Sequence, residues 1–218
     1  MEEHGWPLWD LRIRTPRLVL RPPREADLSR LVQVIRGGIH EPGVTPFRFD
    51  FCCQPPEEIF LGTARFFWRS MAEWKPEKWS LILAVEEEGT IVGVQGVDAQ
   101  DFSELRTVAT GSWLGRSFQG RGIGKEMRHG VLHLAFAGLG AAVALSGARV
   151  GNAQSLGVSH ALGYRENGLK PMMFGQQLGE EIGLRLDRAD WERSERPPIV
   201  IDGLDGCRSM FGESLPSG

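Results

Sequence analysis

Hydrophobic residues recur every three or four positions in four stretches of the chain, a spacing typical of helices with one buried face. The stretches cover residues 25–36, 57–75, 123–139 and 153–162. A proline pair stands before each of the first two, at 22–23 and 55–56, and Asn152 is a suitable cap for the last. The sequence therefore predicts four helices.

Runs of apolar and β-branched residues fill most of the intervals between these helices. They predict strands at residues 17–21, 79–85, 91–97, 107–114 and 143–150, another beginning at 163–164, and a last one that includes 183–186. Helices first, then antiparallel strands, then two strand–helix units indicate a mixed α/β or α+β fold on a central sheet. We expect one domain over residues 1–190 and a C-terminal extension at 191–218.

Composition narrows the class of protein. The chain has 218 residues, 41% of them hydrophobic, and a net charge of −3, which argues against nucleic acid or an anionic membrane as partner. The longest apolar stretch, residues 131–143, contains a histidine and is too short to span a bilayer. Because the cysteine count is odd and MEEHGWPLWD shows no secretory signal, we expect a soluble protein of the reducing cytoplasm.

The segment FQGRGIGKEM, residues 118–127, places three glycines at alternate positions just before a predicted helix. Such glycines let backbone N–H groups approach an anion at the helix start. A dinucleotide fingerprint needs glycine where Lys125 stands, and a Walker A loop needs glycine at Gln119 and Ser or Thr at Glu126. What remains is a Q-x-x-G-x-G turn that leads into a helix.

The order of motifs resembles the GCN5-related N-acetyltransferases (GNAT). A strand ending in GSWLG is followed by QGRGIG, a helix, a strand, NAQS and LGY. The opening T-P-R-L-x-L-R at 15–21 and the N-x-x-S before G-Y are most similar to the branch with ribosomal-protein N-terminal acetyltransferases. GIHEP, DFxxxR and GSWLG also resemble a mycobacterial succinyl-CoA-dependent member. The resemblance covers about residues 13–190.

This resemblance implies a GNAT fold, whose mixed, mostly antiparallel sheet splays into a V-shaped acyl-CoA cleft flanked by helices. It implies that an amine directly attacks the thioester of acetyl-CoA or succinyl-CoA, the acyl-CoA cosubstrate. The residues implied to bind CoA are Trp113, Leu114, Gln119, Gly120, Arg121, Gly122, Ile123, Gly124, Asn152 and Ser155. Arg116 is a further candidate partner for the phosphates.

The resemblance also assigns catalytic roles. A backbone N–H near Leu114 supports the oxyanion, and Ser155 protonates the leaving thiolate, although Ser155 can equally be a first-turn helix serine. The general base stays open, because the carboxylate that family members often carry two residues before the strand glycine is Ala109 here. The upstream acids are Asp98, Asp101 and Glu104. We expect Asp101 first, against the alternative that each is a solvated loop acid.

The candidate residues for substrate binding lie in a Pro/Gly-rich loop and include two arginines. His40 and Glu41 lie in the loop between the first two helices, where the resembled family shapes its acceptor pocket. Arg106 and Arg149 are candidates to bind the carboxylate of a succinyl group, with plain solvent exposure as the alternative. The acceptor itself, a small-molecule amine or a protein N-terminus or lysine, is left open.

Two further questions concern metals and rival functions. His129 and His133 are spaced i, i+4 on a predicted helix, but no third ligand stands at a suitable spacing, so we expect no metal. The rival functions are an aminoglycoside-type antibiotic acetyltransferase and a non-catalytic acyl-CoA sensor. An aromatic-rich second helix suits core packing or a homo-oligomer.

Overall fold

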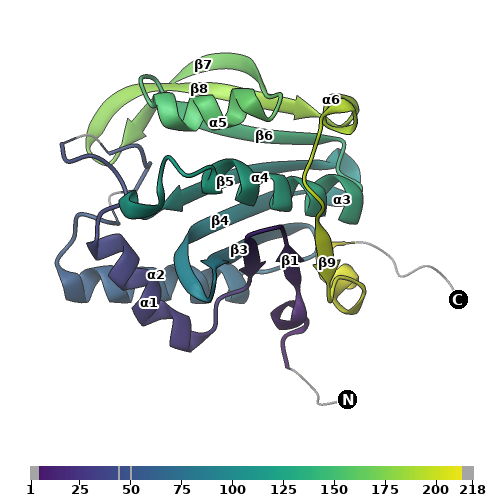
Figure 1. Ribbon diagram of the computed structural model, residues 1–218, viewed down its shortest axis with the longest axis horizontal. Helices are drawn as coiled ribbons and strands as arrows, with labels where there is room; N and C mark the ends of the chain where they lie inside the picture. Colours follow the sequence, from purple (N-terminus) through teal and green to yellow (C-terminus); the bar gives the residue numbers. More distant parts are fainter. Residues whose placement is uncertain (1–4, 44, 50, 213–218) are drawn as a thin grey trace, which may run out of the picture.

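The computed structural model describes residues 5–43, 45–49 and 51–212. Over these residues nine strands form one sheet in the order β7-β8-β6-β5-β4-β3-β2-β1-β9 (Figure 1). The strands are β1 (Arg12–Arg14), β2 (Leu18–Arg21), β3 (Lys78–Glu87), β4 (Thr90–Gln100), β5 (Thr107–Leu114), β6 (Val143–Arg149), β7 (Arg165–Phe174), β8 (Gln177–Asp187) and β9 (Val200–Asp202). The α-helices are α1 (Glu25–Arg36), α2 (Pro56–Ala72), α3 (Phe102–Leu105), α4 (Ile123–His133), α5 (Ala153–Ala161) and α6 (Arg188–Arg193). Because only β5 and β6 pair in parallel, the sheet is mixed and mostly antiparallel, as predicted.

Helices cover both faces of this sheet. Side chains alternate between the two faces of a strand, so Leu83 of β3 packs in the core beneath α4, whereas Ala84 packs against α1 and α2. The α4 face also carries α5 and the larger core; the α1/α2 face carries the smaller one. Within the described ranges no helix is long and apolar enough to cross a membrane.

The parallel pair β5–β6 is short. Thr107–Ala109 pair with Val143–Leu145, and the ladder then stops. Beyond that point β5 continues beside β4 as far as Leu114, and β6 continues beside β8 as far as Arg149. The two strands therefore part toward their C-terminal ends, which gives the sheet the expected splay.

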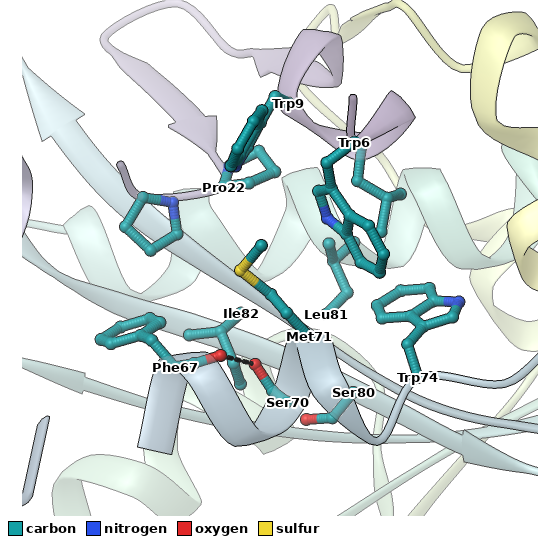
Figure 2. A pocket seen from close by; sticks show the side chains of 12 residues that line it. Trp6, Trp9, Pro22, Phe67, Ser70, Met71, Trp74, Ser80, Leu81 and Ile82 are labelled. Carbon is teal, nitrogen blue, oxygen red and sulfur yellow. Dashed lines mark hydrogen bonds between the residues drawn. The ribbon is translucent and has the colours of Figure 1, made fainter. Parts of the chain in front are cut away.

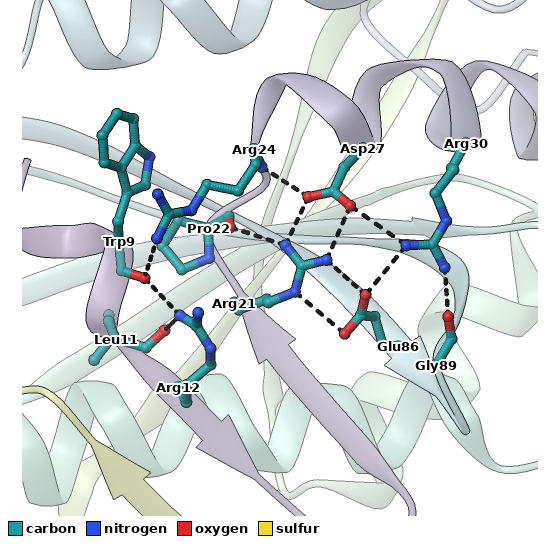
Figure 3. A network of polar contacts seen from close by, with 10 residues as sticks. All are labelled: Trp9, Leu11, Arg12, Arg21, Pro22, Arg24, Asp27, Arg30, Glu86 and Gly89. Atoms are coloured by element: carbon teal, nitrogen blue, oxygen red, sulfur yellow. Dashed lines mark hydrogen bonds and ion pairs between the residues drawn. The ribbon is translucent and has the colours of Figure 1, made fainter.

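A polar network fixes the start of α1 to the sheet (Figure 3). Arg21, the last residue of β2, donates to Asp27 and to Glu86 at 2.6 Å each. Burial by itself raises the pKa of the Asp27 carboxyl, but hydrogen bonds from Arg21 and from the Arg24 backbone N–H outweigh it and lower that pKa. The helix that leads into the α1–α2 loop is thus firmly anchored.

The described part of the C-terminal extension, residues 191–212, packs on the same core. β9 pairs with β1 at the edge of the sheet, and Leu204, Cys207 and Phe211 are buried on the α4 face. β1 and β9 were not predicted from the sequence, because three residues are too few to show an alternation of apolar and polar side chains. The boundary at residue 190 stays a prediction, and residues 213–218 lie outside the described part.

A small aromatic cavity lies between the N-terminal turn η1 (Pro7–Asp10), α2 and β3 (Figure 2). Its volume of about 30 Å³ suits one water molecule at most. Trp6 and Trp74 border it, with ring centroids 6.1 Å apart in an edge-on arrangement. It is too small for a substrate, so the candidate site has to lie elsewhere.

Candidate active site

The glycine turn between β5 and α4 leaves its backbone donors open. Gly120 and Gly122 have φ of +73° and +80°, a left-handed conformation that residues with a Cβ rarely adopt. Gly122 is the N-cap of α4, and no side chain of the described residues caps that first turn. The free N–H groups and the helix dipole can therefore accommodate an anion.

Arg17 lies beside this turn and is a residue that the sequence analysis missed. Its guanidinium donates to the backbone oxygen of Arg121 at 3.1 Å and to the Glu126 carboxylate at 2.7 Å. Thr15 donates to the other oxygen of Glu126, also at 2.7 Å. The T-P-R opening of the chain thus holds the first turn of α4, and the only signal in the sequence was that motif.

Two residues predicted to bind CoA already have partners within the protein. The Gln119 side-chain amide donates to the backbone oxygens of Ile39 and Leu114, both at 3.0 Å, which ties the α1–α2 loop to the end of β5. Arg121 forms an ion pair with Glu87 at 2.8 Å and remains half-exposed beside the turn. Arg121 can meet a phosphate there, whereas the Gln119 amide is already engaged.

Where the β5–β6 ladder stops, side chains replace backbone hydrogen bonds. The Thr110 hydroxyl donates a hydrogen bond to a backbone oxygen of β6, and the Ser146 hydroxyl donates one to a backbone oxygen of β5 at 3.1 Å. Arg128 of α4 is only 4% exposed and donates to Ser112 and Ser146 at 3.2 and 3.3 Å. Its Nε atom is buried without a partner, and no carboxylate of the described residues pairs with it. A buried cation with spare donor capacity therefore lies beside the gap.

The backbone of β5 offers N–H groups to the same gap. Gly115 N–H donates to Val92 of β4, and hydrogen-bonded residues alternate along an antiparallel pair. The N–H of Trp113 therefore faces β4, whereas the N–H groups of Ser112 and Leu114 face away from it. Leu114 is the better placed of the two predicted backbone donors.

Asn152 and Ser155 open α5 on the far side of the gap. Asn152 caps the helix by accepting from the Ser155 backbone N–H at 3.2 Å, as predicted. The Ser155 hydroxyl has no hydrogen bond within the described residues. A Cβ on Gly124 would lie 3.6 Å from Val158 and 3.7 Å from Leu114, so the first turn of α4 contacts both α5 and the end of β5.

The opposite, α1/α2 face of the sheet is open around the point of splay. Ala109, Gly111 and Gly147 are exposed, which leaves a floor of small residues. Asp98 of β4 pairs directly with Ala109 of β5, and directly opposite residues project to the same face. The surrounding protein raises the pKa of the Asp98 carboxyl, even though it is open to water and accepts a hydrogen bond from Ser80.

The α1–α2 loop, residues 37–55, bridges the two sides of the splay. On the β6–β8 side, Arg149 donates to the Thr45 backbone oxygen at 2.7 Å, and Arg48 pairs with the buried Glu181 at 3.0 Å. On the β5 side, the rings of Phe51 and Trp113 lie 6.4 Å apart. The loop therefore passes across the open end of the gap, and Arg149 anchors it.

The other residues predicted to contact the acceptor or the phosphates either lie in this loop or hold it in place. His40 and Glu41 lie within it, and Glu41 forms an ion pair with Arg116 at 2.6 Å. Arg116 is therefore engaged by an acidic side chain, as Arg17 is by Glu126 and Arg121 is by Glu87. Residues 44 and 50 of the loop lie outside the described part.

Two predicted residues lie at the wrong end of β5. Asp101 is the N-cap of α3 and Arg106 is its C-cap, just before the first residue of β5. Leu114 is eight residues further on, which is about 26 Å along a strand. The Arg106 guanidinium instead lies over the Phe102 ring, 5.4 Å from its centroid. The structure does not bring Asp101 or Arg106 together with the other site residues.

The two histidines of α4, His129 and His133, have no third ligand side chain near them among the described residues. Burial, followed by the charges of Lys125 and Arg196, lowers the pKa of His129, whose Nδ1 atom is buried without a partner. His133 instead packs near Trp191, with ring centroids 6.1 Å apart. Among the described residues, neither histidine belongs to a group of three ligand side chains.

The site geometry agrees with comparisons to known proteins. A family model described as the acetyltransferase (GNAT) domain matches residues 17–165. The chain belongs to the GNAT acetyltransferase family. This GNAT protein also shares its fold with solved acetyltransferases, among them ribosomal-protein acetyltransferases.

Three solved structures illustrate the similarity. RimJ of Mycobacterium smegmatis, solved with CoA-disulfide, has 19% identity and a TM-score of 0.69, covering 94% of this chain and 95% of its own. A RimL ribosomal L7/L12 alpha-N-protein acetyltransferase in complex with coenzyme A has 16% identity and a TM-score of 0.63, covering 79% and 95%. The ribosomal-protein-S5-alanine acetyltransferase of Vibrio fischeri has 16% identity and a TM-score of 0.65, covering 83% and 98%.

Proposed function

We propose that this GNAT protein transfers an acyl group from a CoA thioester to a primary amine, by direct attack and without a covalent enzyme intermediate. The observation that carries the proposal is the uncapped, glycine-lined start of α4 beside the splay of β5 and β6. An anion site there suits a pyrophosphate, and the gap suits the extended pantetheine arm. The solved relatives with bound CoA support the same cosubstrate.

The binding roles follow from the positions of the donors. The first-turn N–H groups of α4 take the pyrophosphate, and Arg17 and Arg121 add positive charge beside it. The Leu114 N–H faces the gap and supports the developing oxyanion of the thioester carbonyl. Gln119 acts as a positioning residue that holds the end of β5.

The proton-transfer roles go to residues on opposite sides of the sheet. Ser155, whose hydroxyl has no hydrogen bond in the described part of the chain, donates a proton to the leaving thiolate. Asp98 replaces Asp101 as the candidate base, because it opposes Ala109 at the point where β5 and β6 separate. Its raised pKa suits a group that accepts a proton from an ammonium, directly or through water.

The acceptor approaches over the exposed floor on the α1/α2 face, beneath the α1–α2 loop. The ribosomal-protein acetyltransferases among the solved relatives favour a protein N-terminus over an aminoglycoside. For the acyl donor, the choice between acetyl and succinyl depends on whether a carboxylate partner lies beside the gap. Arg128 replaces Arg106 and Arg149 in that role, because Arg106 is distant and Arg149 holds the loop.

The test is a turnover assay on the full chain with acetyl-CoA and succinyl-CoA, using peptides with free N-termini and aminoglycosides as acceptors. Release of free CoA that depends on the acceptor, together with the acylated product by mass spectrometry, supports an enzyme. Tight CoA binding without turnover on any amine would favour the sensor. Absence of CoA binding would overturn the proposal as a whole.

A further inference from the structure

The α1–α2 loop brings three metal-ligating side chains together. His40 Nε2 lies 3.1 Å from Cys52 Sγ and 3.9 Å from Cys53 Sγ, and the two sulfur atoms are 3.9 Å apart. His40 is twelve residues from Cys52 in the sequence, so it is the fold of the loop that makes this cluster. Its three ligand atoms all lie within 4.8 Å of one another.

The histidine is oriented as a metal ligand would be. Its Nδ1 atom lies 2.7 Å from the backbone oxygen of Glu41. A carbonyl oxygen can only accept, so Nδ1 carries a proton and donates; in the neutral imidazole, the form that binds metals, this leaves a lone pair on Nε2. That lone pair faces the two sulfurs. Metal-ligating histidines commonly donate their second N–H to a carbonyl in this way, which fixes the tautomer and the ring.

The separations fit a tetrahedral zinc site. Zn–S bonds of about 2.3 Å and Zn–N bonds of about 2.0–2.1 Å at tetrahedral angles place two sulfurs about 3.8 Å apart, and a sulfur and a nitrogen about 3.6 Å apart. The observed sulfur–sulfur distance is 3.9 Å, close to the first value, and the two sulfur–nitrogen distances of 3.1 and 3.9 Å lie on either side of the second. Thiolate and imidazole are also the donors that favour zinc over magnesium or calcium.

We propose that His40, Cys52 and Cys53 bind one Zn²⁺, with the fourth position open to water or to an acceptor group. The cluster is accessible, since Cys53 is exposed and the other two residues are half-buried. This inference goes against the sequence expectation of no metal, which rested on His129 and His133. It does not depend on the proposed acyl transfer.

The position of the site indicates its role. The His40 and Phe47 ring centroids are 5.9 Å apart, those of Phe47 and Phe51 are 5.1 Å apart, and Phe51 lies against Trp113 of β5. A metal bound here joins the beginning and the end of the loop that crosses the open end of the splay. Zinc therefore fixes the loop that forms the acceptor side, and it binds as the two thiols lose their protons.

The test measures metal binding directly on the full chain, after chelator treatment under reducing conditions. Zn²⁺ is titrated in competition with a chromophoric chelator, and Co²⁺ serves as a spectroscopic probe in a parallel sample. We expect about one Zn²⁺ per chain and a thiolate-to-cobalt charge-transfer band. His40→Ala, Cys52→Ser and Cys53→Ser each weaken binding by at least about tenfold, whereas Cys207→Ala, which removes a buried core thiol, does not.

Three results would overturn the site. The first is equal zinc affinity in the wild type and in Cys52→Ser. The second is a cobalt spectrum of the wild type without the thiolate band. The third is a Cys52–Cys53 disulfide, detected by mass, in a chain that binds no metal. The cobalt spectrum of the wild type needs no variant, so a misfolded variant cannot hide the answer. Because none of these measurements uses acyl-CoA, failure of the zinc site and failure of acyl transfer are distinguishable.

Discussion

Asp98 on β4 and Ala109 on β5 are directly paired, and Ala109 is also the last residue of β5 that pairs with β6. The family resemblance implies a carboxylate on the strand at Ala109, and the neighbouring strand offers the Asp98 carboxylate directly opposite that position. The Cβ atoms of directly opposite residues are about 4.5–5.5 Å apart, so a carboxylate on Asp98 lies only one strand spacing from a carboxylate at position 109.

Replacing Asp98 by asparagine should lower kcat by about 10²- to 10⁴-fold, the usual contribution of a general base. CoA affinity should change little, because the group acts on the amine. In the wild type, the acid limb of kcat/KM should lie above the ordinary aspartate pKa of about 3.9, since the protein around this solvent-accessible carboxyl limits its hydration and so raises its pKa.

Asp101→Asn is the matched control, because Asp101 lies at the other end of β5 and should leave kcat unchanged. The double variant Asp98→Asn with Ala109→Asp should recover part of the lost turnover. Full activity in Asp98→Asn would rule out this base.

Gly122→Ala should weaken CoA binding. At φ of +80° a Cβ costs on the order of 1 kcal/mol, and it would lie 3.4 Å from the Arg17 guanidinium beside the anion site. A hundredfold excess of CoA over its Kd should stabilise the wild type by about 2.7 kcal/mol, read as a rise in Tm. Gly157→Ala, with open space around its Cβ, is the control. The same Tm shift in both variants would exclude phosphate binding at the start of α4.

Ser155→Ala should reduce kcat by about tenfold to a thousandfold without weakening CoA binding, because protonation of the thiolate matters in the transition state. Asn152→Ala should instead cost about 0.5–2 kcal/mol of stability, since Asn152 provides the helix cap. Steady-state kinetics and thermal unfolding on both variants separate the two roles. Unchanged kcat in Ser155→Ala would leave that serine a structural residue.

Arg128→Met should remove a preference for succinyl-CoA over acetyl-CoA. A charge-assisted hydrogen bond from the buried guanidinium to the succinyl carboxylate contributes about 1.5–3 kcal/mol, or roughly ten- to a hundredfold in affinity. Binding titrations with both thioesters measure the ratio, and Arg106→Met, at the far end of β5, is the control. A wild type that binds the two thioesters equally would remove the carboxylate pocket and leave acyl transfer untouched.

Asp27→Asn should destabilise the fold by about 3 kcal/mol at pH 7, because it leaves Arg21 without one partner of a buried pair. The folded-state pKa of Asp27 is lowered, so its stabilisation is complete above the unfolded pKa of about 3.9 and is lost as pH falls through the folded value. Urea unfolding of both proteins should show a constant difference from pH 5 to 7 that shrinks in more acidic buffer. A difference that grows on acidification would contradict this linkage.

Local patterns in the sequence determined the central elements of this protein. The predicted strand at 107–114 coincides with β5, and Asn152 caps α5 as expected. Gly120 and Gly122 adopt a left-handed backbone within the turn that was predicted before α4. These features depend on neighbouring residues: the alternation of side chains, a cap three residues from its target, and the absence of a Cβ. The order of the same motifs was sufficient to indicate the GNAT family.

Tertiary structure decided which side chains meet. Asp98 rather than Asp101 faces the point of splay because strand register, not distance in the sequence, puts β4 beside Ala109. Arg17 reaches the glycine turn from more than a hundred residues away, and His40 meets Cys52 only through the path of the loop. Such contacts arise from long-range packing of strands and loops, for which the periodicity of a single segment carries no information.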